Sequence, residues 1–443
     1  MIRLALCDLR DHAATWTGAF LVAVACGFIG GFAASLMATA RTYPNTESLA
    51  ASVLVFSAVA AVAVLVSAAG LTVAAQRRSY ALWQLANVGP RWVTAVVLAQ
   101  LAVVAMLGAV AGTLIEAVSF APLFPLVFSS PQYQPIDHVV PDAGLPFMPA
   151  VWLAVACVFL VGGSKGARSA GRTPPLDALR EPEPARKGMT WLRVLLFAGL
   201  AFGTGQLAAS LLGKDPDALS NSLFLPLFMA ATLVPVAPVV FSSLLGVWTS
   251  LVPQGRSCAW CLARHTARFG LLASTSVETP IMVGFGLVAG IFSLSSSLTA
   301  VIRQQGSTLN ASLDFTSAIL LLGGPILLCA VGAAVSVVMS SKTRTRDVAL
   351  LVASGARPGT LLGAAVCEAL IHAVTATFVG AAVVVASNAV IAYAVGLPLF
   401  ANLAFSEGLV VSLAGFALVL AATLVPTCAA LGRAPAAVLA AGE

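Results

Sequence analysis

The chain has 443 residues, of which 59% are hydrophobic and only 9% are charged. This composition excludes a soluble globular body, because too few polar residues remain to cover a surface that faces water. The net charge of +6 does not indicate nucleic-acid binding, since the cations are spread over several short segments and form no single basic patch. Membrane lipid is the expected surrounding, and no nucleic-acid partner is expected.

Ten apolar segments approach or exceed the roughly 20 residues that an α-helix needs to cross a bilayer. In chain order they lie at about 16–40, 49–74, 93–120, 149–163, 189–212, 222–251, 279–300, 315–340, 361–394 and 407–427. The sequence therefore predicts an all-α polytopic membrane protein with about ten transmembrane helices.

The positions of Lys and Arg predict the orientation of these spans, because both residue types collect on the cytoplasmic side. With the N-terminus placed inside, only Arg41, Lys214 and Arg303 of the 23 cationic residues fall in outer segments. An even number of spans returns the chain to its starting side. Both termini are therefore predicted to be cytoplasmic.

Three short elements occur twice in the same order, which indicates an internal duplication. A leader precedes spans one and seven, a cassette at 78–90 and 346–358 precedes spans three and nine, and a Pro-x-x-x-Leu tail follows spans four and ten. The cassettes align without a gap at a shift of 268 residues, from 78 to 346, and the same shift pairs Gln100 with Glu368 and Gly112 with Gly380. We predict two four-span modules, 1–180 and 258–443, joined by a pair of spans within 181–257.

Each cassette ends in residues that are suited to a sharp turn between two helices. Residues 77–86 predict a short interfacial helix with an apolar side. Asn87 and Gly355 are the residue types that best tolerate the left-handed conformation after a helix. Pro90 and Pro358 follow where a new helix can begin without an amide donor. The two copies thus predict one backbone geometry from different residues.

The second cassette, Arg346 through Ala356, together with Glu368 and the Pro-x-x-x-Leu tail, resembles the signature of the FtsX-like permeases of the MacB type. These are membrane subunits of ATP-binding-cassette systems, and their signature helix reads Arg-x-x-Ala-Leu-Leu-x-Ala-x-Gly-Ala. The first cassette, with Trp83 and Asn87, matches more loosely. The ten-span layout is similar to that of the bacitracin-exporter branch.

The resemblance implies that each cassette is a coupling helix that docks on a separate ATPase subunit, with two ATPase copies per permease chain. The chain contains no Gly-x-x-x-x-Gly-Lys-Ser/Thr stretch, so we expect no catalytic residue and no cofactor here, and ATP and Mg on the partner. An interfacial anchor without a partner is the alternative. The expected ATPase-coupling residues are Arg78, Ala81, Leu82, Leu85, Asn87, Arg346, Ala349, Leu350, Ala353 and Gly355.

The outer segments are short, which departs from the large extracytoplasmic domain that is common in this family. The longest, at about 121–148, is rich in proline. We therefore expect the spans themselves to recognise a hydrophobic or amphipathic compound, such as a peptide, a lipid-like molecule or a drug, with lateral access between the modules. The candidate substrate contacts are Phe120, Phe124, Phe128, Tyr133 and Phe147. Alternatively, these rings pack the segment onto the ends of the spans.

Four polar residues fall inside the predicted spans, where such residues are costly: Gln100, Glu116, Glu368 and His372. The resemblance makes Glu368 a structural or coupling residue, and its counterpart Gln100 argues against obligatory proton transfer. Glu116 either faces a cavity or reaches the headgroups, and a single histidine such as His372 is expected to serve in packing. No metal site is expected.

The expected function is therefore export or extraction of such a compound from a bacterial inner membrane, driven by a separate ATPase. An antimicrobial-sensing or immunity module that signals to a membrane histidine kinase is the alternative. An ion-coupled secondary transporter, which would need neither ATP nor a partner, is a third reading.

Overall fold

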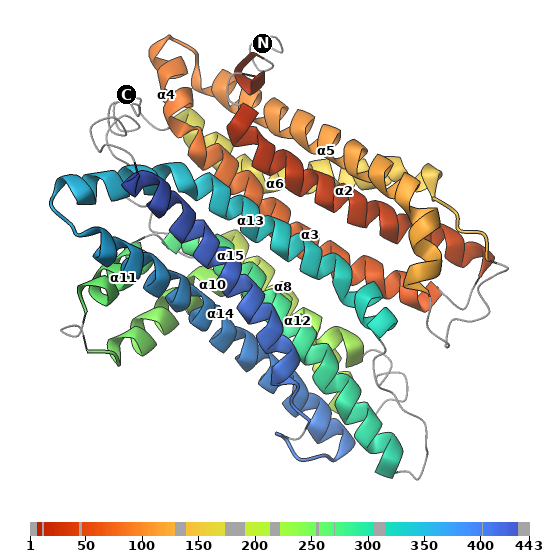
Figure 1. The fold of residues 1–443 in the computed structure, drawn as a ribbon. Helices are drawn as coiled ribbons and strands as arrows, with labels where there is room; N and C mark the ends of the chain where they lie inside the picture. The colour runs from red at the N-terminus through yellow and green to blue at the C-terminus, as the bar shows by residue number, and fades with distance from the viewer. Residues whose placement is uncertain are drawn as a thin grey trace. The chain divides into compact units, whose positions relative to one another are not determined.

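The computed structural model describes residues 7–10, 13–43, 47–128, 139–172, 191–212, 222–253, 257–269, 271–304, 315–400 and 402–432. Within these ranges every regular element is helical and no strand occurs (Figure 1). Ten of the described helices are long and apolar enough to cross a membrane. The predicted all-α polytopic fold is thereby confirmed.

The helices follow one another along the chain with short connections. Their bounds are α2 Ala13–Thr42, α3 Glu47–Ala75, α4 Arg77–Leu85, α5 Pro90–Val127, η3 Leu145–Phe147, α6 Met148–Arg172, α8 Trp191–Leu212, η4 Ser222–Phe224, α10 Leu225–Ser250, α11 Cys258–Phe269, α12 Leu271–Gln304, α13 Phe315–Ala353, α14 Pro358–Val395 and α15 Phe405–Leu431.

Contacts divide the chain into two compact units. Unit 1 comprises Met1–Glu183 and Asp314–Met339, and unit 2 comprises Pro184–Leu313 and Ser340–Glu443. Helix α13 therefore contributes its first part to unit 1 and its last part to unit 2. The division at 180 and 257 rests on the sequence repeat and stays a prediction.

The core of unit 1 is built on the close approach of α2 and α5. A Cβ atom placed on Gly112 of α5 would overlap the carbonyl oxygen of Val24 and lie 2.6 Å from the amide nitrogen of Phe28, both in α2. Gly108 faces Ala23 in the same way. Small residues let two helices in lipid approach closely enough for dispersion contacts to hold them.

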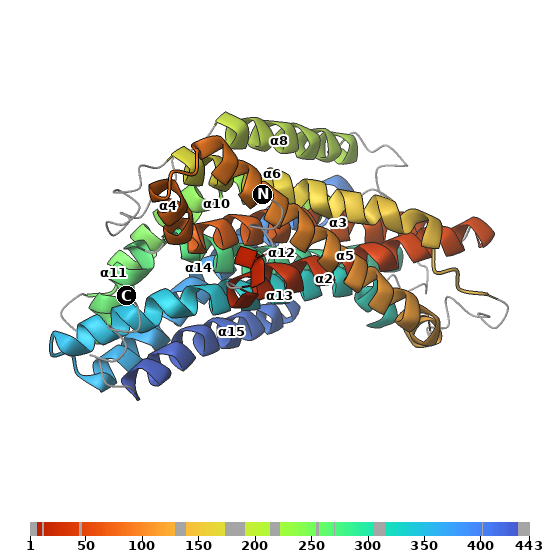
Figure 2. The same ribbon diagram turned by 90° about the horizontal axis from the view of Figure 1, so that it is seen from above.

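Unit 2 is arranged around α12. Within the apolar window of this helix 83% of the residues are buried, and α12 contacts α10, α14 and α15. In contrast, only 11% of the α8 window is buried, and α8 lies at the edge of the unit beside α10 (Figure 2). The most enclosed helix of unit 2 is therefore also the one where an ionisable residue would be hardest to leave unpaired.

Two boundaries differ from the sequence prediction. Helix α5 does not end near residue 120 but continues to Val127, with Pro122 and Pro125 inside it, and Figure 1 shows it bending near this end. The extension is held because Phe120 and Phe124 are buried against residues of α2 and α3, which offsets the backbone bonds that proline removes. The second cassette forms no separate helix, because α13 runs unbroken to Ala353.

Candidate functional site

The first coupling segment, residues 77–88, is a separate short helix followed by a turn. Gln76 interrupts the chain between α3 and α4 with φ −105° and ψ 8°. Tyr80 and Ala81 are buried in unit 1, whereas the side chains of Leu82 and Leu85 are 51% and 54% exposed. An apolar pair is thus presented away from the unit, as a docking surface requires.

The two coupling segments close with the same backbone hydrogen bonds. In the first, the amide of Asn87 donates to the carbonyl of Gln84 and that of Val88 to the carbonyl of Trp83, each at 3.0 Å. Shifted by 268 residues, the amide of Gly355 donates to Val352 and that of Ala356 to Leu351, again at 3.0 Å. Both patterns are Schellman motifs.

The residues at the centre of these turns have the predicted left-handed conformation. The φ angle is 67° at Asn87 and 92° at Gly355, and Pro90 and Pro358 begin α5 and α14 as expected. Both following helices are 38 residues long. The repeat seen in the letters is therefore also a repeat of backbone geometry.

The second coupling segment, residues 346–356, differs in being the end of a long helix. Val348 and Ala349 are buried in unit 2, whereas Leu350 is 44% exposed and Arg346 and Ala353 are exposed. The buried and exposed positions match those of the first segment at the same shift, since Ala349 pairs with Ala81 and Leu350 with Leu82. The side chain of Arg78 lies outside the described residues.

A buried set of uncharged donors and acceptors ties the first segment to α5. The Tyr80 hydroxyl donates to Oε1 of Gln76 at 2.8 Å and lies 3.5 Å from Oε1 of Gln100. Gln100 in turn donates through Nε2 to Oδ2 of Asp8 at 2.8 Å. We call Asp8, Gln76, Tyr80 and Gln100 the first brace. Burial, with the charge of Asp8 adding to it, raises the pKa of Tyr80, so its hydroxyl remains a neutral donor.

Charged side chains occupy the equivalent place in unit 2. Arg344 and Glu368 form a bidentate pair, with Nη1 to Oε1 at 2.8 Å and Nη2 to Oε2 at 2.6 Å. His372 lies one turn farther along α14, with Nε2 3.9 Å from Glu368 Oε1. Its Nδ1 is 2.8 Å from Oε1 of Glu278 in α12. We call Arg344, Glu368, His372 and Glu278 the second brace.

The two braces share a register that sequence reasoning missed in part. The shift of 268 residues pairs Gln76 with Arg344 just as it pairs Gln100 with Glu368, but Gln76 and Arg344 lie just outside the cassettes as we defined them. Glu278 was expected at the start of a span, where an interfacial position was open. It is instead fully buried, and its link to His372 could be found only in three dimensions.

Glu116 lies deep between α2 and α5. It is buried and accepts a hydrogen bond from the Ser35 hydroxyl at 2.9 Å, while its Oε2 has no hydrogen-bond partner among the described residues. Ser35 also donates to the carbonyl of Ala143, which precedes η3. Glu116 therefore holds the end of α5 against α2.

The candidate substrate contacts in the described residues are largely covered by their own neighbours. Phe120, Phe124 and Phe128 are buried and form a ladder of rings with centroid separations of 5.6 and 4.5 Å. Phe147 is half-buried under the guanidinium of Arg41, 4.5 Å from its ring centre. Tyr133 lies outside the described residues. Substrate contact by these rings stays a prediction and would require them to move.

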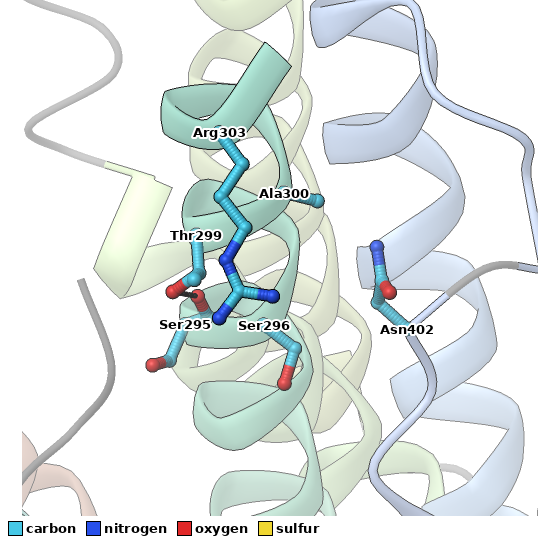
Figure 3. Close-up of a pocket in the computed structure, with 6 residues that line it drawn as sticks. All are labelled: Ser295, Ser296, Thr299, Ala300, Arg303 and Asn402. Carbon is cyan, nitrogen blue, oxygen red and sulfur yellow. Dashed lines mark hydrogen bonds between the residues drawn. The ribbon is translucent and has the colours of Figure 1, made fainter. Parts of the chain in front are cut away.

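A polar pocket of about 280 Å³ lies at the end of α12 in unit 2 (Figure 3). The Arg303 side chain runs back along the helix toward Ser295 and Ser296, and Asn402 faces it from the segment before α15. No carboxylate lines this pocket; the lining residues are Ser295, Ser296, Thr299, Ala300, Arg303 and Asn402.

Residues 320–435, which contain the second coupling segment with α14 and α15, match the family model described as FtsX-like permease C-terminal. The chain carries an FtsX-like permease domain. This match supports an ABC-transporter permease family, a membrane component of transport and not a catalytic enzyme, whose members generally partner with ABC ATPase subunits. No curated protein and no solved structure gives a significant match to the chain.

Proposed function

We propose that this chain is the membrane permease subunit of an ABC transporter, which exports or extracts a hydrophobic or amphipathic compound with energy from a separate ATPase. The observation that carries the proposal is the pair of coupling segments, which share one turn geometry and each present exposed leucine at the same register. Two equivalent docking sites fit two ATPase copies per chain.

The proposed setting is a bacterial inner membrane with both termini and both coupling segments on the cytoplasmic side. The distribution of Lys and Arg supports this orientation. The substrate class is supported by the apolar character of the spans and by the pocket at Arg303, which would suit the polar end of an amphipathic molecule.

Reconstitution tests this function directly. Vesicles that contain the chain and its ATPase should move substrate only when ATP is hydrolysed. Because Leu82 and Leu350 are the exposed apolar residues of the two segments, Leu82→Asp with Leu350→Asp should abolish ATPase binding in a pull-down. Leu145→Asp is the matched control, since Leu145 is 65% exposed at the opposite end of α6 from the first segment.

Two results would contradict the proposal. ATPase binding that survives both leucine changes would remove the coupling segments from the interface. Substrate binding that depends on a membrane kinase, without ATP-driven movement in vesicles, would favour the sensing module instead.

A further inference from the structure

The second brace reaches farther into its unit than the first brace does. Arg344 lies two residues before the second coupling segment on the same helix, so displacement of that segment displaces the guanidinium. From Arg344 the contacts pass to Glu368 and His372 of α14 and then to Glu278 of α12. Because α12 is the central helix of unit 2, the chain of contacts joins the segment to the core of the unit.

The first brace ends elsewhere. Its contacts run from Gln76 and Tyr80 to Gln100 of α5 and stop at Asp8, which belongs to the helical residues 7–10 that precede α2. Gln76 also sits at a break between α3 and α4, whereas Arg344 sits inside unbroken α13. The first brace therefore holds its segment to α5 but has no printed link into the body of a second spanning helix.

Folding does not require the charges of the second brace. The first half holds the same place with two amides and a hydroxyl, all buried. A buried ion pair is a weak source of stability, because the desolvation of both groups offsets much of their attraction, and uncharged replacements of similar shape are often tolerated. A pair that keeps its bidentate geometry at one copy of a duplicated site calls for a role other than stability.

We propose that Arg344, Glu368, His372 and Glu278 are positioning residues that transmit the ATPase-driven movement of the second coupling segment to α14 and α12. The inference rests on the proposed function and deepens it, since it makes the two halves unequal: the second half drives the rearrangement of its spans, and the first half holds its ATPase contact.

The decisive variant turns the second brace into a copy of the first. Arg344→Gln with Glu368→Gln places the residues of positions 76 and 100 at the equivalent sites. The double variant should insert, bind the ATPase and stimulate hydrolysis as the unaltered chain does. Substrate moved per ATP hydrolysed should fall about five-fold or more, which corresponds to the lower end of typical coupling between sites.

The exchanged pair, Arg344→Glu with Glu368→Arg, supplies the rescue. It restores an ion pair between α13 and α14, so it should transport more per ATP than either single change. His372→Gln, which keeps a hydrogen-bonding side chain on α14, should lower transport per ATP without weakening ATPase binding. Tyr80→Phe is the matched control in the first brace and should leave transport per ATP unchanged.

The outcomes separate this inference from the function on which it rests. Absence of ATP-driven transport in the unaltered chain would overturn both. Unchanged transport per ATP in the Gln/Gln variant would overturn the inference alone. Failure of that variant to insert would also overturn it, because the pair would then be needed for folding.

Discussion

Residues 76–100 of the first half and residues 344–368 of the second half perform the same turn between two helices with different chemistry. The backbone hydrogen bonds of the two turns are equal in pattern and length, and both turns lead into a helix of 38 residues. The side chains beneath them are amides and a phenol in one copy and an ion pair in the other. After duplication, geometry was retained where the chain must bend, and chemistry was free to diverge where side chains only need to satisfy one another.

The largest difference between the halves should appear when a brace residue is replaced by leucine. Glu368→Leu leaves the Arg344 guanidinium without its partner, and we expect a loss of about 3 kcal/mol, at the low end of the cost of breaking a buried pair because the Arg344 side chain is 21% exposed. Gln100→Leu should cost about 1–2 kcal/mol, as expected for uncharged groups that lose a hydrogen bond.

The measurement is thermal or denaturant unfolding of the purified protein in detergent micelles. Equal losses for Glu368→Leu and Gln100→Leu would show that the charge in the second brace has no energetic consequence, and the comparison between the braces would then rest on shape alone.

The second difference concerns the paired glycines of α5 and α14. Gly112→Ala places a methyl group against the backbone of α2, which cannot move aside, so we expect a loss of about 2–3 kcal/mol. The Cβ of Gly380→Ala would lie 2.9 Å from Cδ1 of Phe285, a side chain that can rotate, and about 1 kcal/mol is expected.

The yield of folded protein after detergent extraction and its unfolding temperature report this pair of variants. A greater loss for Gly380→Ala than for Gly112→Ala would mean that the α12–α14 contact is the more rigid of the two.

A smaller difference is expected at the turns. Gly355→Ala should cost about 1–2 kcal/mol, because its φ of 92° lies in the left-handed region that a Cβ disfavours. Asn87→Gly should change stability by no more than about 0.5 kcal/mol, because glycine adopts a φ of 67° readily. Gly355→Asn, the reverse exchange, should be milder than Gly355→Ala. Unfolding temperatures of the three variants check this order, which a tolerated Gly355→Ala would break.

The smallest effect is expected for the Tyr80 hydroxyl. Tyr80→Phe removes its bond to Gln76 and should cost about 1 kcal/mol, which is typical of one buried neutral hydrogen bond. The affinity of the ATPase for the permease, measured by titration in detergent, should stay the same because Leu82 and Leu85 remain in place. A marked loss of affinity would mean that the first brace sets the docking surface directly.

Local signals in the sequence predicted the spans and the turns. Long apolar runs, Asn87 and Gly355 at a left-handed position, and Pro90 and Pro358 at helix starts each depend on a few neighbouring residues. The braces depend on contacts between residues 24 to 94 positions apart, so composition and periodicity carry no signal for them. The repeat offered a partial route, because extending the cassette by two residues would have paired Gln76 with Arg344.

The misplaced elements show the same limit. Pro122 and Pro125 predicted a loop after residue 120, but the rings of Phe120 and Phe124 find a buried place that keeps the helix going. The extension therefore reflects tertiary contacts that override a local preference.

Helix α14 is unusually long for its environment, and this length places the second elbow. At 1.5 Å per residue its 38 residues span about 57 Å, whereas a bilayer with both headgroup layers is about 40–45 Å thick. Even in an upright position, more than about 10 Å of the rod must stand clear of the lipid, and tilting cannot hide both ends at once. A stand-off of this kind would hold the turn at Gly355 above the headgroups, within reach of a water-soluble protein that never touches the membrane.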